Sequence, residues 1–475
     1  MYSWLQFGGA IIITLPLCTN NSPLYKQIYD WLKTEIQCKN YKPNDKIPSK
    51  RKLSEHLCVS INTIDLAYSQ LMDEGYILSV PKKGYYVSNI DVYHNINIVQ
   101  HEGTLLTEHI NDLKIDFSPS DIDHKAFPYK TWRNLFKSCF NEFDHSILKR
   151  TTAQGNMGLR RELVSFLHSS RGVNCEERQI VIGAGTESSL RTISLILGNK
   201  TPIALENPVY RKAYRTFEHM GHEILPIPID NKGIEIEPLK DHSNVAVYVT
   251  PSHQFPLGVS MPIGRRIELL NFANKADGRF IIEDDYDSEF RYIRKPLPSL
   301  QSIDQNGKVI YVGTFSTSIA PSIRMSYMIL PLMLLKVYNK LFSEFGSEVS
   351  ILEQKIIEKF IAEGSYERHL NRMRKLYKDK RAHFIKELSI FGDRIKVVGE
   401  SAGNHLLINL ITENSERQMC SAAIENGVKV YPISDYFIGE VISKYENTFL
   451  LGFGALSKNE IEEGVKLLYK AWVLK

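Results

Sequence analysis

Four polar segments of this 475-residue chain each follow an apolar run with the length of a buried strand. The apolar runs span 179–182, 245–249, 280–282 and 309–312, and the polar segments span 183–187, 250–258, 283–289 and 313–318. Because the runs alternate with amphipathic helical patterns, they predict parallel strands in an α/β domain. Ligands of such domains bind at the carboxyl ends of the strands. We therefore expect the four segments, here called the strand-end site, to lie where a ligand binds.

The first of these segments points to a phosphate group. In Gly183-Ala-Gly-Thr-Glu187 a glycine turn enters a helical pattern. Backbone N–H groups at the start of a helix suit an anion. Gly185 and Thr186 are therefore candidate phosphate-binding residues.

A cluster of cationic side chains near the N-terminus suggests contact with a polyanion. Lys50, Arg51 and Lys52 are consecutive, and the block 23–88 holds ten Lys and Arg against seven Asp and Glu. The whole chain, with 58 basic and 54 acidic residues and a net charge of +4, is too balanced for a polybasic binder. Any surface for nucleic acid must therefore be local.

The block 23–88 has the pattern of three helices and a hairpin. A first helix starts at Pro23 and ends near Cys38, Ser49 precedes a short helix over 50–57, and Ser60 caps a third. The third helix carries Ile64, Ala67, Leu71 and Met72 on one side. Strands over 76–80 and 85–87 then flank a turn in which Gly84 supplies the backbone freedom.

Composition divides the chain into an apolar N-terminal arm (1–22), the charged block (23–88), a flexible linker (89–112) and the α/β domain (113–475). The arm lacks the basic residues of a signal peptide and is too short to span a membrane. It is either a flexible arm or the product of a start codon placed upstream of the real one. Six cysteines without a C-x-x-C spacing indicate no metal site and suit a cytosolic protein.

The charged block resembles the GntR-type winged helix-turn-helix, through IPSKRKLSEHLCVS at 47–60 and NTIDLAYSQLMDEGY at 62–76. The resemblance implies a double-stranded DNA operator, with the second helix of the motif in the major groove. The residues expected at the groove are Ser60, Asn62, Thr63 and Tyr68. Those expected near the DNA backbone are Lys46, Ser49, Lys50, Arg51, Lys52, Lys82 and Lys83.

One position departs from the GntR-type pattern. Ile61 stands where that family usually has an Arg directly after the Val-Ser pair. Loss of a charge-assisted donor should change or relax the base preference by about 1–3 kcal/mol at one position. Each lysine of the block, taken alone, has the alternative role of a solvated surface charge.

The strand-end segments, in their order and spacing, resemble the class I aminotransferase fold, whose members bind pyridoxal 5′-phosphate. Behind a GntR-type head they are similar to MocR/GabR-type transcriptional regulators, over nearly the whole chain from Pro23 onward. Several segments match that pattern closely, including TPSHQFP at 250–256 and IIEDDYDSEF at 281–290. The resemblance implies a fold-type I α/β domain with a mainly parallel sheet over 113–475.

The same resemblance assigns cofactor-binding roles. Asp284 would lie opposite the pyridine nitrogen, Tyr286 would bond the ring hydroxyl, and Tyr210 would stack on the ring. The phosphate would be held by Gly185, Thr186, Thr314, Ser316 and Arg324. Taken singly, Asp284 has the alternative role of a strand-end cap, Tyr210 of core filler and Arg324 of an ion-pair partner.

Thr317 occupies the position of the family's Schiff-base lysine. A threonine hydroxyl cannot form an imine, and the nearest lysine, Lys308, lies across a strand, so no catalytic residue is assigned and the cofactor could bind only without a covalent bond. Ala455 and Lys212 replace two arginines that bind a carboxylate, and Ser322 replaces a glycine. A plain amino acid is therefore a poor effector candidate.

The sequence thus predicts a cytoplasmic transcription regulator that senses a small molecule, pyridoxal phosphate or a related compound, and is neither an enzyme nor a membrane protein. The resemblance implies a homodimer, head-to-tail and domain-swapped, on a repeated or palindromic operator. Two alternatives stay open. The large domain is a ligand-free dimerisation scaffold, or it is a residual aminotransferase.

Overall fold

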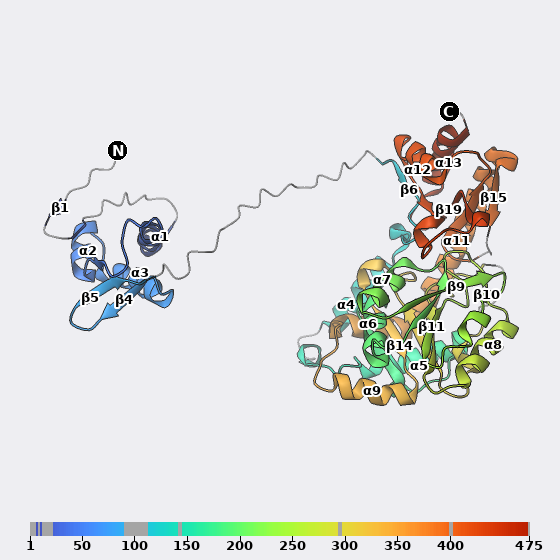
Figure 1. The fold of residues 1–475 in the computed structure, drawn as a ribbon, viewed down its shortest axis with the longest axis horizontal. Helices are drawn as coiled ribbons and strands as arrows, with labels where there is room; N and C mark the ends of the chain where they lie inside the picture. Colours follow the sequence, from blue (N-terminus) through green and yellow to red (C-terminus); the bar gives the residue numbers. More distant parts are fainter. Residues whose placement is uncertain are drawn as a thin grey trace. The chain divides into compact units, whose positions relative to one another are not determined.

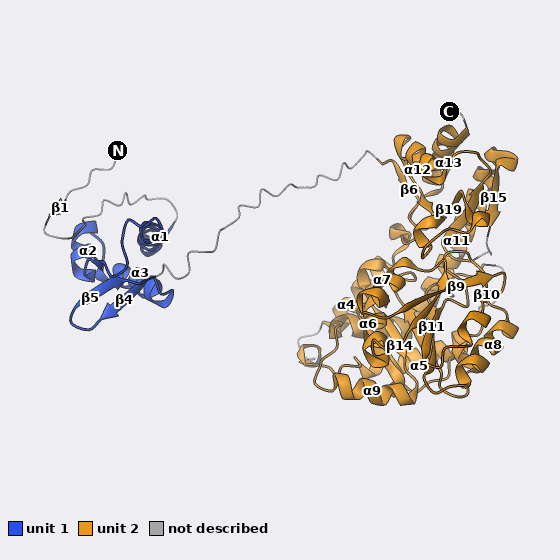
Figure 2. Ribbon diagram, viewed as in Figure 1, with its two compact units in different colours: residues 1–108 blue, residues 109–475 orange. Residues whose placement is uncertain are grey.

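The computed structural model describes residues 6–7, 10–11, 22–89, 113–140, 145–292, 297–398 and 402–473. The chain forms two compact units, residues 1–108 and 109–475 (Figure 2). The predicted linker, 89–112, lies outside the described residues except for Asn89, and so does most of the predicted arm. Within the arm, β1 (Gln6–Phe7) and β2 (Ala10–Ile11) pair as short antiparallel strands.

The first unit contains the three predicted helices, α1 (Leu24–Gln37), α2 (Lys50–Leu57) and α3 (Ile61–Asp73). Both serine caps are present. The Ser49 hydroxyl accepts a hydrogen bond from the backbone N–H of Lys52 at 3.3 Å, and that of Ser60 accepts one from Thr63 at 3.1 Å. These caps satisfy N–H groups that the first turn of a helix leaves free, so they fix where α2 and α3 begin.

The predicted hairpin follows as β4 (Ile77–Val80) and β5 (Gly84–Val87). A third strand, β3 (Lys46–Ile47), pairs with β5 from the other side and was not predicted from the sequence. Two residues are too few to show a strand pattern. The buried faces of the helices and the hairpin share one apolar core, so this unit has the winged helix-turn-helix architecture.

An eight-stranded sheet forms the centre of the second unit (Figure 1). In spatial order its strands are β10 (Gly233–Ile234), β9 (Ile224–Asp230), β8 (Ile203–Asn207), β11 (Val245–Val249), β12 (Arg279–Asp285), β13 (Val309–Thr314), β14 (Ser326–Ile329) and β7 (Ile180–Gly183). The strands from β9 to β13 are parallel to one another. The sheet is therefore mainly parallel, which confirms the predicted fold class.

The sequence predicted that the run 179–182 forms a parallel strand, but the corresponding strand β7 has no parallel neighbour. It lies at the edge of the sheet and pairs antiparallel with β14, which itself pairs antiparallel with β13. The chain turns back after β13, and β14 occupies the place beside it. Two antiparallel steps leave β7 running in the same direction as β13, so segment 183–187 still lies at the edge that holds the other strand-end segments.

Helices cover both faces of this sheet. On one face, α6 (Thr186–Leu197), α7 (Arg211–His219) and α9 (Leu332–Phe342) share a core with Tyr248 and Ile282. On the other, α8 (Ile263–Asn274) packs with Val247 and Ile281. Neighbouring residues of a strand point to opposite faces, and this alternation sends β11 and β12 side chains into two different cores. A further cluster joins α4 (Tyr129–Cys139), α5 (Met157–Arg171) and α10 (Ile351–Ala362) to β7.

A second sheet belongs to the same unit. It is antiparallel, in the order β15 (Ile395–Val398), β16 (His405–Leu410), β19 (Thr448–Gly452) and β18 (Tyr431–Pro432). It shares a core with α11 (Ser365–Leu388), α12 (Glu416–Glu425) and α13 (Lys458–Val473), and Figure 1 shows α12 and α13 beside each other there. Strand β6 (Ile115–Asp116) pairs with β17 (Val428–Lys429), so the start of the unit joins its C-terminal part. None of the helices in the described ranges combines the length and apolar character needed to cross a membrane.

Candidate functional site

The predicted DNA-contacting residues of the first unit lie at its surface, with one exception. On α2, Arg51 and Lys52 are exposed and Lys50 is half-buried. At the start of α3, Ser60 and Asn62 are exposed. The remaining surface positions are Lys46, Ser49, Thr63, Lys82 and Lys83.

Tyr68 is the exception, and its predicted place at the DNA groove is wrong. The residue is fully buried, and its hydroxyl donates to the Pro48 carbonyl at 2.8 Å. Its ring meets that of Tyr85 edge to face at 5.1 Å between centroids. Tyr68 lies on the same side of α3 as Ile64 and Leu71, so it packs α3 against the wing strand β5.

Three further predicted DNA-contacting residues, Lys50, Ser60 and Thr63, have side chains that bond within the unit. The Lys50 ammonium pairs with Asp65 and lies 5.2 Å from the Tyr85 ring centroid, which ties α2 to α3 and the wing. The hydroxyls of Ser60 and Thr63 lie 2.7 Å apart and bond each other. Arg51 is less constrained, since its exposed side chain pairs with Glu55 one turn along the same helix at 3.1 Å.

Replacing Arg51 with Ala should weaken operator binding and reduce its salt dependence, because one fewer phosphate contact releases fewer counterions. The slope of log K against log salt should fall by about 1. Loss of the exposed pair with Glu55 should cost less than about 0.5 kcal/mol of stability. The measurement is a binding titration at several salt concentrations beside Arg178→Ala, an exposed arginine of the second unit. An unchanged slope would place Arg51 away from the DNA.

In the second unit, the carboxyl end of β12 holds Asp284 in a buried position. Its Oδ2 accepts a hydrogen bond from the Tyr248 hydroxyl at 2.5 Å, while its Oδ1 is buried without a hydrogen-bond partner among the described residues. Burial raises the pKa of Asp284 to about 7, against the Tyr248 hydrogen bond, which lowers it. Tyr248 was not predicted. It lies opposite Ile282 in the β11–β12 register, and therefore on the same face as Asp284.

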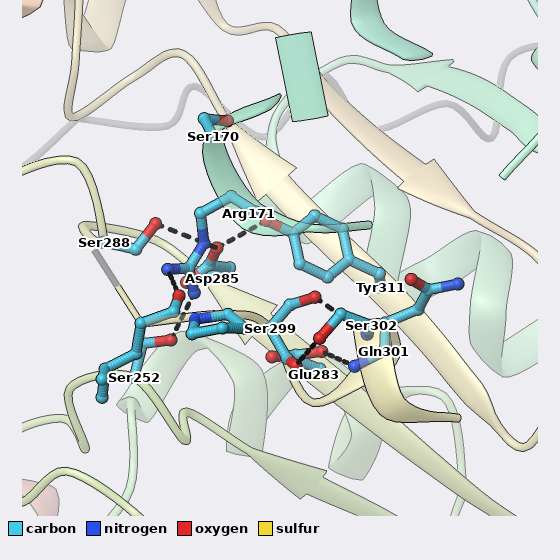
Figure 3. A network of polar contacts seen from close by, with 12 residues as sticks. Ser170, Arg171, Ser252, Glu283, Asp285, Ser288, Ser299, Gln301, Ser302 and Tyr311 are labelled. Atoms are coloured by element: carbon cyan, nitrogen blue, oxygen red, sulfur yellow. Dashed lines mark hydrogen bonds and ion pairs between the residues drawn. The ribbon is translucent and has the colours of Figure 1, made fainter. Parts of the chain in front are cut away.

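The two carboxylates beside Asp284 point the other way and fix the strand end. Arg171, from the end of α5, makes a buried two-pronged pair with Asp285, with Nε to Oδ2 at 2.7 Å and Nη2 to Oδ1 at 3.1 Å (Figure 3). The hydroxyls of Ser288 and Tyr311 also donate to Asp285 Oδ2, at 2.9 and 2.5 Å. Glu283 accepts the backbone N–H groups of residues 300 and 301 at 2.7 and 2.8 Å. This network holds β12 so that Asp284 faces the opposite side.

At the start of α6, the structure brings predicted phosphate-binding residues together. Gly185 adopts a φ of +91°, and a Cβ atom there would lie 2.7 Å from Nη2 of Arg324, so glycine serves both the turn and the close approach. Arg324 pairs with Glu187 at 2.7 Å, and Lys212 pairs with the other oxygen of Glu187 at 3.2 Å. Burial raises the pKa of Glu187, but the hydrogen bond from Arg324 and the charge of Lys212 outweigh it and lower the pKa to about 2.

The other two predicted phosphate ligands, Thr314 and Ser316, lie at the end of β13 and just after it. Thr314 is buried, and its hydroxyl accepts the backbone N–H of Ser316 at 3.1 Å. Thr317, next in the chain, donates its hydroxyl to the carbonyl of Tyr286 at 2.5 Å, so this position lies against the end of β12. Lys308 lies at the opposite end of β13, where its ammonium donates to the carbonyls of residues 276 and 277. It is held away from Thr317, as predicted.

Aromatic rings and two unpredicted histidines complete the strand-end site. Phe255 contacts the rings of Tyr210, Tyr286 and His405 at centroid distances of 5.6 to 5.7 Å. The hydroxyl of Tyr286 lies 3.0 Å from Nδ1 of His253, which also bonds Asp287 at 2.7 Å. Burial raises the pKa of Tyr210, as do the nearby charges of Glu187 and Asp284, while Arg324 lowers it. Tyr210 therefore lies in one electrostatic environment with the predicted ligands.

His405 lacked a signal in sequence because no charge or spacing pattern marks it, whereas His253 lies in the segment 250–256 that carried the family resemblance but was given no role there. Nδ1 of His405 is buried without a hydrogen-bond partner in the described ranges. Burial, then the neighbouring His253, lowers the pKa of His405 to about 3, so its ring is neutral. Within the same ranges no group of three or more His, Cys, Asp or Glu is arranged to hold a metal ion.

Ala455 lies on the loop after β19 and carries no charge toward the site. Lys380 on α11 donates to the carbonyl of Gly454, the residue before Ala455, at 2.8 Å and pairs with Asp123 at 2.7 Å. The side chains of Lys380 and Asp123 are both largely buried. Lys380 is thus already neutralised and does not substitute for a free carboxylate-binding arginine.

A winged helix-turn-helix head joined to an aminotransferase-like domain defines a DNA-binding transcriptional regulator. Residues 24–87 match the family described as bacterial regulatory proteins, gntR family. The second unit is similar to the kynurenine aminotransferase of Pyrococcus horikoshii, solved in complex with PMP, with a TM-score of 0.67 and 26% identity over 76% of this chain and 90% of that chain.

Relatives along nearly the whole chain identify the family. The chain is 38% identical over 460 residues to the uncharacterized HTH-type transcriptional regulator YdeL of Bacillus subtilis, covering 96% of this chain and 98% of YdeL. It is 30% identical to the pyridoxine biosynthesis transcriptional regulator PdxR of Corynebacterium glutamicum, over 87% and 88% of the two chains. It is 29% identical to the probable rhizopine catabolism regulatory protein MocR of Rhizobium meliloti, over 95% and 94%. The chain belongs to the MocR/PdxR family of HTH-type transcriptional regulators.

Proposed function

We propose that the strand-end site binds pyridoxal 5′-phosphate or a closely related compound without a covalent bond, and that this binding changes the affinity of the head for its operator. In this role the second unit is a sensor and not an enzyme. Relatives named as transcriptional regulators support the regulatory role, and the similar aminotransferase solved with PMP supports the class of ligand.

Asp284 is the observation that carries the proposal. Its Oδ1 is buried without a partner among the described residues, and burial raises its pKa to about 7. A ligand with a protonated ring nitrogen would supply both the missing hydrogen bond and a compensating charge. Pyridoxal 5′-phosphate has such a nitrogen, and when bound it supplies an electron-accepting ring. The residues present therefore fit this group.

The opposite end of the site suits the phosphate. Gly185 and Thr186 stand at the N-terminus of α6, and the Arg324 guanidinium lies against Gly185. Arg324 is paired with Glu187, so a phosphate would compete with this carboxylate for the guanidinium. That exchange gives the site two arrangements, one with Arg324 on Glu187 and one with Arg324 on a ligand.

Thr317 supports binding without a covalent bond. Its hydroxyl is engaged by the Tyr286 carbonyl and cannot attack an aldehyde to give a stable imine. The proposal includes a homodimer, domain-swapped as the family resemblance implies, and a place in the cytoplasm with the chromosome. A ligand-free scaffold and a residual aminotransferase are the alternatives that experiments must separate.

Pyridoxal 5′-phosphate should bind the full-length protein reversibly, and dialysis should remove it. Asp284→Asn should weaken binding about tenfold or more, because a charged hydrogen-bond partner of the ring nitrogen is lost. The measurement is an absorbance titration, followed by borohydride treatment and mass spectrometry. A borohydride-stable adduct on a lysine of the site would contradict the proposal, and absence of binding would favour the scaffold.

A further inference from the structure

The exposed side of α3 carries two large apolar residues at positions that face solvent in the free protein. Ile61, the first residue of the helix, is 51% exposed, and Leu66 is 58% exposed. Asn62, Asp65 and Ser69 share this side, while the opposite side is buried in the core. An exposed isoleucine at the first position of a helix contributes little to folding, so the Ile61 side chain is free to contact another molecule.

The neighbouring polar groups narrow what this side of α3 can recognise. The Ser60 hydroxyl caps the helix and bonds the Thr63 hydroxyl, and Lys50 pairs with Asp65. The Asn62 side chain is exposed and makes no hydrogen bond among the residues that the structure describes. At the N-terminal end of α3, the side chains still available to contact DNA are therefore the amide of Asn62 and the aliphatic side chain of Ile61. The N-terminal residues of the second helix of this motif are those that contact base edges.

These two side chains match the A·T base pair. In the major groove, guanine offers two acceptors, which call for a cationic donor, whereas thymine offers its C5-methyl group. Ile61 has no donor and complements a methyl group. An Asn side chain pairs with the N6 and N7 edge of adenine. We propose that Ile61 contacts a thymine C5-methyl group in each operator half-site, and thus sets a preference for A·T at that position.

The test first selects operator sequences from a random duplex pool with the full-length protein, and then replaces single thymines of the selected duplex with deoxyuridine. This replacement removes the methyl group and keeps base pairing. At one position per half-site, the wild type should bind the deoxyuridine duplex about fourfold more weakly, the effect expected for one buried methyl group. Ile61→Ala should bind the two duplexes equally.

The matched control is Ile263→Ala. Ile263 is also the first residue of a helix, α8, and is 60% exposed, but it belongs to the second unit. This variant should keep the wild-type preference for thymine. Equal binding of thymine and deoxyuridine duplexes by the wild type at every position would overturn the proposal, as would an unchanged preference in Ile61→Ala. Ile61→Arg, used in the same selection, should shift the preferred base at that position to guanine.

Discussion

Arg171→Ala should destabilise the second unit by about 3–5 kcal/mol, the cost of leaving a buried charge without its partner. Arg171 and Asp285 are both buried, and their two-pronged contact is the centre of the network in Figure 3. The urea midpoint of this unit should fall by about 1 M or more. Because the network fixes the end of β12, the variant should also weaken ligand binding at Asp284.

The matched control for this variant is Arg178→Ala, which removes an exposed pair with Glu176 at 2.6 Å. Exposed pairs contribute about 0–1 kcal/mol, so the midpoint should barely move. Arg171→Lys keeps the positive charge but loses the planar guanidinium that contacts both carboxylate oxygens, so its urea midpoint should lie between those of the two alanine variants. Equal midpoints for Arg171→Ala and Arg178→Ala would show that the buried pair does not fix β12.

Thr317→Lys should convert reversible binding of pyridoxal 5′-phosphate into a covalent bond that borohydride can trap. A lysine amine desolvated at this half-buried position is partly deprotonated and can attack the aldehyde. The expected result is a stable mass increase on residue 317 and a ligand that dialysis does not remove. Thr317→Met, of similar length but without an amine, should give no adduct.

Amino-acid turnover by Thr317→Lys should remain very slow. Ala455 offers no charge to a substrate carboxylate, and Lys380 nearby is already paired with Asp123. Poor orientation of a substrate can cost several powers of ten in rate. Failure to trap an adduct even at high ligand concentration would mean that the site differs from an aminotransferase site in more than residue 317. Rapid turnover would refute the role given to Ala455.

Local signals predicted much of the fold. Ser49 and Ser60 marked the starts of α2 and α3, because a helix cap depends only on neighbouring residues. The apolar run 245–249 marked β11 (Val245–Val249), because a buried strand is also visible in consecutive residues. The antiparallel pairing of β7 depends on β14, more than a hundred residues further along the chain, and left no local signal. Tyr68 was misplaced although its spacing of four residues from Ile64 and three from Leu71 already put it on the buried side of α3, where its hydroxyl bonds the Pro48 carbonyl.

The strand-end site was predicted through its segments, but several of its contacts required the structure. Asp284 and Arg324 stood out by charge and position, whereas Tyr248 lies in an apolar run and looked like an ordinary core residue of a strand. The register of β11 and β12 could have revealed it, since Tyr248 and Asp284 share a face. Arg171 bonds Asp285 across 114 positions of sequence, and no pattern along the chain links two such residues.

The most direct test of the account is the operator affinity of the full-length protein with and without saturating pyridoxal 5′-phosphate, in the wild type and in Asp284→Asn. Coupling between two sites is typically worth about 1–3 kcal/mol, so the wild-type affinity should change about fivefold or more. Asp284→Asn, whose site should bind the ligand about tenfold more weakly, should need about ten times as much ligand for the same change in operator affinity. An unchanged wild-type affinity, at ligand concentrations that fill the site, would contradict the account and leave the second unit as a scaffold.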